Sequence, residues 1–209
     1  MKVNPRKTQL VCVSAAIHSE VTSHVNDGEG GRILSQDSMT VLGFSFGSRP
    51  TMTEHVALVR RKYNARSWVI RHLKAAGVPN EDIIKVYAAT VRSSIEYASV
   101  VYHTMLTTSQ SEEIERMQRR CLKIIYGFRV SYREALERSG IQSMKERRVQ
   151  AFKKFTDKTA ESGRFDHWFP VQEKTKYNLR RPQKYMEFHA STERLYRSPI
   201  FSMRRLLNN

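Results

Sequence analysis

The sequence predicts a mainly α fold that begins with a short β-hairpin or strand pair, continues as an antiparallel helical bundle and ends in a basic, loosely structured tail. In the first fifty residues two short runs, at 9–16 with alternating Val11 and Val13 and at 39–46, suit strands. From residue 51 they recur at steps of three and four, as along one face of a helix. Beyond residue 163 both periods fade, and aromatic residues lie among cations and prolines. These changes predict four divisions, at residues 1–50, 51–127, 128–163 and 164–209.

The first division predicts two strands. Residues 9–16 suit a short buried strand, and residues 39–46 suit a second, in which Gly43 marks a bulge or a close backbone approach. The polar stretch between them has Asp-Gly-Glu-Gly-Gly at 27–31, which favours a hairpin or a mobile loop. A strand pair at the start of a chain has an exposed edge, so we expect a preceding segment to be missing.

Helix starts are marked by capping boxes, in which a hydroxyl and a carboxylate satisfy the unpaired amides of the first turn. They predict helices over 51–76, 109–126, 131–139 and 143–162, and the paired residues are Thr51/Glu54, Ser109/Glu112, Ser131/Glu134 and Ser143/Glu146. Gly77 is predicted to cap the first helix, and Pro79 blocks its continuation.

A further helix is predicted to start at this proline and to pack antiparallel to the helix at 109–126, because only a short link joins the two. Its apolar stripe contains Ile84, Tyr87, Val91, Ile95, Ala98 and Val101. The second helix repeats the spacing with Ile114, Met117, Cys121 and Ile124, and Arg116, Arg119, Arg120 and Lys123 occupy its remaining faces. That packing would leave the arginine-rich surface free for a partner.

Charge and cysteine usage restrict the class of protein. With 36 Lys+Arg against 20 Asp+Glu, the net charge is +16, which favours a polyanionic partner, nucleic acid ahead of an acidic membrane surface. A basic protein without such a partner is the alternative. Cys12 and Cys121 form neither a disulfide framework nor a metal-spaced set. No apolar run approaches the roughly 20 residues that span a bilayer, so we expect an intracellular protein.

The sequence offers little for catalysis, and we predict no catalytic residue and no metal ligand in this chain. It has no aspartate pair placed to hold two metal ions, no Gly-x-Ser-x-Gly elbow and no phosphate-binding glycine loop. Its seven histidines are scattered without ligand-like spacing. Glu96 lies beside Tyr97, but a helix carboxylate is more often an ion-pair or packing partner.

Nucleic acid is the better-supported ligand, because arginine can donate two parallel hydrogen bonds to a phosphate. The candidate backbone-binding residues are Arg60, Arg61, Lys62, Arg66, Arg71, Arg116, Arg119, Arg120, Lys123, Arg147 and Arg148. The alternative for the helix at 109–126 is a solvated face whose cations pair with Glu112, Glu113 and Glu115. Tail aromatics could stack bases, although packing is the more ordinary role.

The order of motifs carries a family resemblance. Ser-Ile-Glu-Tyr-Ala at 94–98, followed by Glu-Arg-Met-Gln-Arg-Arg at 115–120, closely resembles the region after the polymerase palm in reverse transcriptases of LINE-type (non-LTR) retrotransposons. Residues 1–8 resemble the palm segment that follows the catalytic aspartates, and 42–44 the strand that closes the palm. The resemblance implies a truncated palm remnant at 1–50, a helical thumb at 51–127, a basic helical extension and a basic tail.

The resemblance implies a fragment of an RNA-directed DNA polymerase that binds template–primer through its backbone. Lys7 matches a lysine proposed to protonate the leaving pyrophosphate, and Gly43 and Phe44 match the primer-contacting turn. The family's catalytic aspartates are not matched, so the fragment is expected to be inactive alone. Magnesium is the cofactor of the full-length family, and none is expected for this chain. Expected partners are an RNA–DNA hybrid and the polymerase half, with a nuclear location if the chain acts as a retroelement protein.

Two alternatives remain from other classes. One is a free-standing basic helical module that binds RNA, and the other is a helical interaction module whose exposed edge docks a separate chain. Salt-insensitive protein binding would favour the docking module over the other two.

Overall fold

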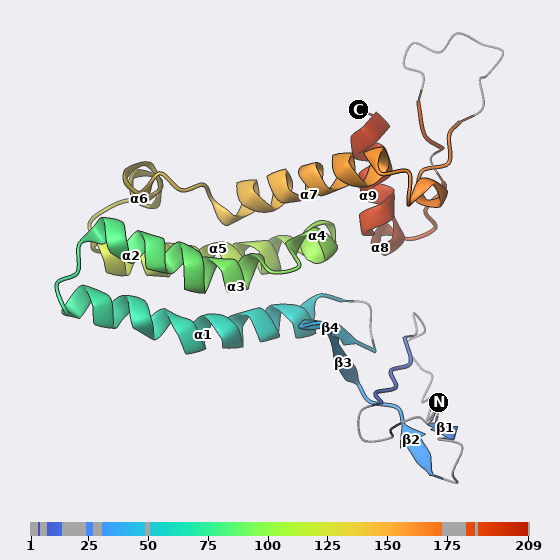
Figure 1. The fold of residues 1–209 in the computed structure, drawn as a ribbon, viewed down its shortest axis with the longest axis horizontal. Helices are drawn as coiled ribbons and strands as arrows, with labels where there is room; N and C mark the ends of the chain where they lie inside the picture. The colour runs from blue at the N-terminus through green and yellow to red at the C-terminus, as the bar shows by residue number, and fades with distance from the viewer. Residues whose placement is uncertain are drawn as a thin grey trace. The chain divides into compact units, whose positions relative to one another are not determined.

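The structure, a computed structural model, describes residues 4, 8–13, 24–26, 31–48, 51–172, 183–186 and 188–208. The chain divides into two compact units, Met1–Lys62 and Tyr63–Asn209. As predicted, it is mainly helical, with short antiparallel hairpins near the N-terminus (Figure 1). Among the described residues, no helix has the length and apolar character needed to cross a membrane.

The first unit contains two hairpins. They consist of β1 (His24–Asn26) paired with β2 (Arg32–Leu34), and β3 (Ser38–Val41) paired with β4 (Phe44–Gly47). The first confirms the hairpin predicted around the glycine-rich stretch. The single strand predicted over 39–46 is wrong, because Leu42 and Gly43 have φ values of 48° and 78° and turn the chain back on itself. Gly43 is thus a turn residue and no bulge.

The strand predicted over 9–16 is not found within the described part of this segment, residues 8–13. An isolated parallel bridge joins Leu10 to Ser35 there, and the amide of Gln36 donates to the carbonyl of Leu10. Alternating valines alone therefore do not make a strand here.

The helix α1 (Thr53–Ala75) begins slightly later than predicted. The amide of Val56 donates to the carbonyl of Met52, so Met52 takes the N-cap position predicted for Thr51. Its end confirms the prediction. Gly77 has φ 76°, its amide donates to the carbonyl of Lys74, and the amide of Val78 donates to that of Leu73. This pair of bonds is a Schellman motif, which satisfies the last carbonyls of the helix.

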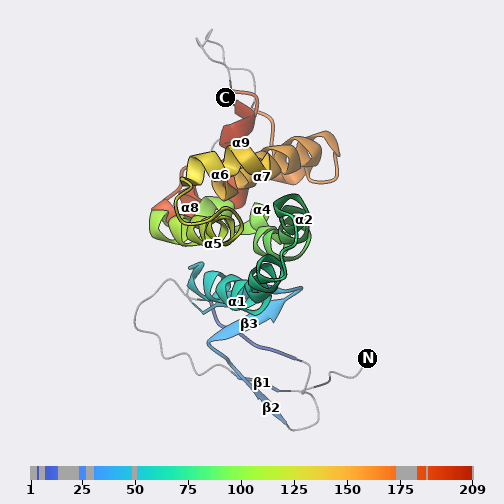
Figure 2. The ribbon, with the colours of Figure 1, turned by 90° about the vertical axis from the view of Figure 1, so that its left-hand side faces the viewer.

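The second unit contains the remaining helices. They are α2 (Asn80–Val86), the π-helical η2 (Tyr87–Arg92), α3 (Ser93–Glu96), α4 (Ser99–Tyr102), the 3₁₀ segment η3 (His103–Met105), α5 (Thr108–Tyr126), α6 (Tyr132–Ser139), α7 (Met144–Glu161), the 3₁₀ segment η4 (Asp166–Trp168), α8 (Glu193–Tyr196) and α9 (Pro199–Asn208). The chain runs from α2 to α4 and returns along α5, which packs against α2 (Figure 1). Both views show α7 lying across α4 and α5 (Figure 2).

The helix predicted from Pro79 to Val101 is interrupted. Ala98 has φ 58°, a left-handed conformation that ends α3 and redirects the chain into α4. The hydroxyl of Tyr102 donates to the carbonyl of Ile95 at 2.7 Å across the break and so satisfies a carbonyl at the helix end. Val101 is consequently 39% exposed instead of buried.

The helix starts of this unit agree with the predictions at two of three positions. The side chain of Ser131 accepts from the amide of Glu134, and Ser143 and Glu146 form a complete capping box. The predicted Ser109 cap is wrong. Thr107 caps α5 instead, and Gln110 completes its box.

Between these helices lies an apolar core. Its fully buried members include Ile70, Ile83, Tyr87, Val91, Ile95, Ile114, Cys121, Leu122 and Ile125. In the tail, Phe152, Phe169, Tyr185 and Met203 form a second cluster, against which Phe165, Trp168, Leu206 and Leu207 pack. The described tail therefore packs through its aromatic residues and adds the ten-residue helix α9, which contacts α7.

Candidate nucleic-acid interface

The helix α5 has two chemically opposite faces. Successive residues of a helix are rotated by about 100°, so positions i, i+3, i+4 and i+7 share one face. Its buried face contains Ile114, Met117, Gln118, Cys121, Leu122 and Ile125. The opposite face contains Arg116, Arg119, Arg120 and Lys123, which we call the α5 stripe; its arginines are exposed and Lys123 is half-buried.

In the part of the chain that the structure describes, no ion pair joins Arg116, Arg120 or Lys123 to a carboxylate. Of the three acids in the alternative, Glu112, Glu113 and Glu115, the carboxylate of Glu115 instead accepts hydrogen bonds from Tyr132 and from two backbone amides of α7. The stripe therefore presents uncompensated positive charge, the requirement for phosphate binding.

One stripe residue is held in place by stacking. The guanidinium carbon of Arg119 lies 4.9 Å from the ring centroid of Tyr132. The hydroxyl of Tyr132 donates to Glu115 and accepts from the amide nitrogen of Gln118 at 3.0 Å. A cation over an aromatic face is attracted by the ring quadrupole and keeps its hydrogen-bond donors available. Arg119 is thus oriented by the ring, and no ion pair joins it to a carboxylate in the described part of the chain.

A chain of hydrogen bonds positions α5 against its neighbours. The hydroxyl of Tyr87 donates to Oε1 of the fully buried Gln118 at 2.8 Å, and Nε2 of Gln118 also donates to the carbonyl of Gln142 at 3.0 Å. Glu115 then accepts from the amides of Met144 and Lys145 at 3.1 and 3.0 Å. A carboxylate at a helix N-terminus satisfies free amides and favours the helix dipole. The network fixes which face of α5 points outward.

The first turn of α7 holds its cations in a different way. Arg147 donates from Nε and Nη2 to the two oxygens of Glu96 at 2.9 and 3.0 Å, a bidentate pair. This raises the pKa of Arg147 and confirms the ion-pair role expected for Glu96. Arg148 is only 1% exposed and donates from Nη2 to Oγ of Ser111 at 2.6 Å. We therefore exclude Arg148 from the surface, since a buried guanidinium cannot reach a duplex.

The α1 cations do not form a comparable stripe. Arg60, Arg61 and Lys62 are consecutive and so point to different sides of the helix. Lys62 donates to the carbonyl of Gly43 at 3.4 Å. Arg66 and Arg71 are both exposed, and Arg66 donates to the carbonyl of Thr90 at 3.3 Å.

The residues matched to the primer-contacting turn lie in the first unit. Gly43 is in the β3–β4 turn, and Phe44 is buried with its ring stacked on that of His55 at 4.2 Å. Burial, together with the charge of Lys62, lowers the pKa of His55 to about 4. Phe44 therefore has a core role in this unit. Lys7 lies outside the described residues.

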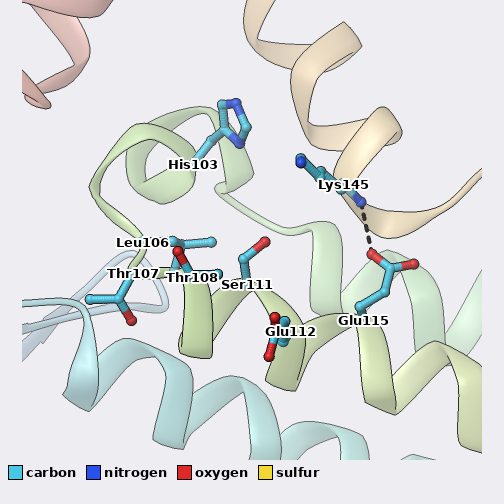
Figure 3. Close-up of a pocket in the computed structure, with 8 residues that line it drawn as sticks. All are labelled: His103, Leu106, Thr107, Thr108, Ser111, Glu112, Glu115 and Lys145. Atoms are coloured by element: carbon cyan, nitrogen blue, oxygen red, sulfur yellow. Dashed lines mark hydrogen bonds between the residues drawn. The ribbon is translucent and has the colours of Figure 1, made fainter.

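A ligand-sized cleft was not anticipated. It has a volume of about 350 Å³ and lies where η3, the start of α5 and the start of α7 meet (Figure 3). His103, Ser111 and Lys145 line it. Burial and the charges of Arg148 and Lys145 lower the pKa of His103 to about 4, so its imidazole is neutral at pH 7. These residues come from three separate elements, and no motif links them in the sequence.

Within the described residues, no three His, Cys, Asp or Glu side chains gather closely enough to hold a metal ion. Comparisons of this chain with protein-family models, with curated proteins and with solved structures gave no match.

Proposed function

We propose that the second unit binds the sugar–phosphate backbone of a nucleic-acid duplex through the α5 stripe, in the manner of a reverse-transcriptase thumb. The stripe is the observation that carries the proposal. It places three exposed arginines and a lysine on one face, opposite the core, with Arg116, Arg120 and Lys123 free of ion pairs among the described residues. Guanidinium groups spaced along one helical face suit successive phosphates.

The resemblance to LINE-type reverse transcriptases gives the proposal its substrate, a template–primer in the form of an RNA–DNA hybrid. The motif that carries much of this resemblance, residues 115–120, supplies both the stripe and the network beneath it. Glu115 and Gln118 point into the fold, whereas Arg116, Arg119 and Arg120 point outward. In one short motif, therefore, some residues hold the helix in place and the others are the proposed ligands of the phosphates. Contacts of this kind are independent of base sequence.

The experiment is binding of the full chain to a labelled RNA–DNA hybrid, measured by fluorescence anisotropy at several salt concentrations. Affinity should fall by orders of magnitude between about 50 and 200 mM salt, because each neutralised phosphate releases counterions. The triple variant Arg116→Glu, Arg120→Glu and Lys123→Glu should bind about 100-fold more weakly at the low-salt end.

A control of equal charge change separates the stripe from general basicity. Lys153, Lys154 and Lys158 are exposed on α7, and their replacement by glutamate changes the net charge by the same amount. This control should retain most of the affinity. Equal losses in the two triple variants, or no binding by the unaltered chain at low salt, would contradict the proposal.

A further inference from the structure

A buried positive charge lies behind Ser111, one of the residues that line the cleft between η3, α5 and α7. Arg148 is 1% exposed, and its Nη2 donates to Oγ of Ser111, which lines the cleft. Its Nε and Nη1 have no hydrogen-bond partner among the described residues, and no carboxylate there forms an ion pair with it. The carboxylates of Glu115 and Glu96 attract this charge without forming an ion pair with it, yet burial lowers the pKa of Arg148, so an anion in the cleft would further stabilise the charged form. Because Ser111 accepts from Arg148, its own hydroxyl proton is free to donate into the cleft.

A second cation reaches the cleft from α7. Lys145 lies in the first turn of that helix, where the helix dipole disfavours positive charge, and its ammonium has no ion pair within the described chain. Figure 3 shows its side chain extending over the cleft toward His103. Lys145 is exposed at the rim of the cleft, so its ammonium can reach an anion bound there.

The remaining groups of the cleft are compatible with an anion. Thr107 caps the nineteen-residue helix α5 at the edge of the cleft, so the positive end of the helix dipole lies there. The carboxylate of Glu115 is occupied by the first amides of α7, and Glu112 points away from His103 and Lys145 (Figure 3). Nδ1 of His103 has no partner among the described residues, which leaves the neutral imidazole one further hydrogen bond to make.

We propose that this cleft binds the phosphate group of a nucleotide, with Lys145 and Ser111 as direct ligands and Arg148 as the positioning residue behind Ser111. The inference rests on the proposed nucleic-acid function for its ligand class. A volume of about 350 Å³ lies within the usual range for ligand pockets and accommodates more than a bare phosphate. The same chemistry is present in a free nucleotide and in the phosphorylated end of a strand.

The test compares binding of a nucleoside 5′-monophosphate, the unphosphorylated nucleoside and inorganic phosphate to the full chain by calorimetry. The monophosphate should bind and the nucleoside should not. Lys145→Met should weaken monophosphate binding by about tenfold or more, because a charge-assisted hydrogen bond is lost. Lys153→Met, on an exposed position of the same helix, is the matched control and should have no effect.

Two oligonucleotides identify the source of the phosphate. If a 5′-phosphorylated strand binds more tightly than its 5′-hydroxyl counterpart and Lys145→Met abolishes the difference, the ligand is a strand end. If only the monophosphate responds to Lys145→Met, the ligand is a free nucleotide. Absence of saturable binding of every phosphorylated probe, or equal losses in Lys145→Met and Lys153→Met, would overturn the assignment.

The role of Arg148 is tested by comparing a variant that removes its charge with one that keeps a charge. Arg148→Met should lower monophosphate affinity severalfold, and Arg148→Lys, which keeps a charge behind Ser111, should restore most of it. A purely structural role would not follow the charge in this way. The stripe variant Arg116→Glu, Arg120→Glu and Lys123→Glu should lose hybrid binding and keep monophosphate binding, so that failure of this inference and failure of the proposed function are distinguishable.

Discussion

The cations on the outer face of α5 and the neighbouring pair Arg147 and Arg148 on α7 have opposite environments. Arg116, Arg120 and Lys123 on α5 have no acidic partner among the described residues. On α7, Arg147 is held by both oxygens of Glu96 and Arg148 is buried. The number of cations in a segment therefore does not measure its capacity to bind phosphate. What matters is whether the tertiary structure has already supplied each cation with a partner.

The difference follows from where the acids of α5 are directed. Glu115 could have neutralised the stripe, but its carboxylate caps α7 and accepts from Tyr132. Glu96 lies on α3 and faces α7, so it neutralises Arg147. Both acids thus assemble the helices, and the cations that they do not reach remain available to a ligand.

The largest effect on stability is expected at Glu115. Replacing it by alanine removes the acceptor of two α7 amides and of the Tyr132 hydroxyl, which should lower the free energy of unfolding by about 2 to 3 kcal/mol. Urea denaturation measures this change. Glu112→Ala, on an exposed position of the same helix, should change it by less than about 0.5 kcal/mol. Similar losses at the two positions would remove the basis of the comparison.

A smaller pair of effects should separate the two regions cleanly. Arg147→Gln should lower the free energy of unfolding by about 1 kcal/mol, because the ion pair is partly exposed to solvent, and should leave hybrid affinity nearly unchanged. Arg116→Gln should leave stability within about 0.5 kcal/mol and weaken hybrid binding by about three- to tenfold. Urea denaturation measures the stability of the two variants, and fluorescence anisotropy measures their affinity for the hybrid. Loss of affinity in Arg147→Gln would show that the paired arginine also contacts the ligand.

The last pair of effects concerns the start of α5, which orients the stripe. Thr107→Ala should cost about 1 kcal/mol, because the side chain of Thr107 accepts from the amide of Gln110. Ser109→Ala should be nearly neutral, since Ser109 is exposed inside the first turn and does not cap the helix. Thermal unfolding of the two variants distinguishes the cap in the structure from the cap that the sequence predicts.

Several features set by local chemistry were predictable. The capping box at Ser143, the cap at Ser131 and the Schellman motif at Gly77 depend only on residues within one or two turns. The outward direction of the stripe follows from the period of Ile114, Met117 and Cys121. Such features need no knowledge of the remaining chain.

Features set by tertiary context were not predictable. Leu42 adopts a positive φ in a hairpin turn, a conformation that leucine rarely takes. The sequence therefore contains no sign of a turn, and it predicts residues 39–46 as a single strand. Ala98 has a left-handed conformation that interrupts the helix within an uninterrupted apolar period, and the hydroxyl of Tyr102 satisfies a carbonyl across the break. The buried Arg148 donates to Ser111, thirty-seven positions away. The spacing of apolar residues along the sequence predicts none of these three features.

The central claim is that unpaired cations on α5, and not total charge, bind the nucleic-acid backbone. The most direct test is the slope of log affinity against log salt for an RNA–DNA hybrid. Replacing Arg116, Arg120 and Lys123 by glutamine should make the slope shallower by about 2 to 3, close to one per lost phosphate contact.

The same replacement of Arg133, Arg138 and Arg147, which are paired with Glu137, Glu134 and Glu96, removes equal charge and should leave the slope nearly unchanged. Equal decreases in the two triple variants would contradict the account, because binding would then follow net charge alone.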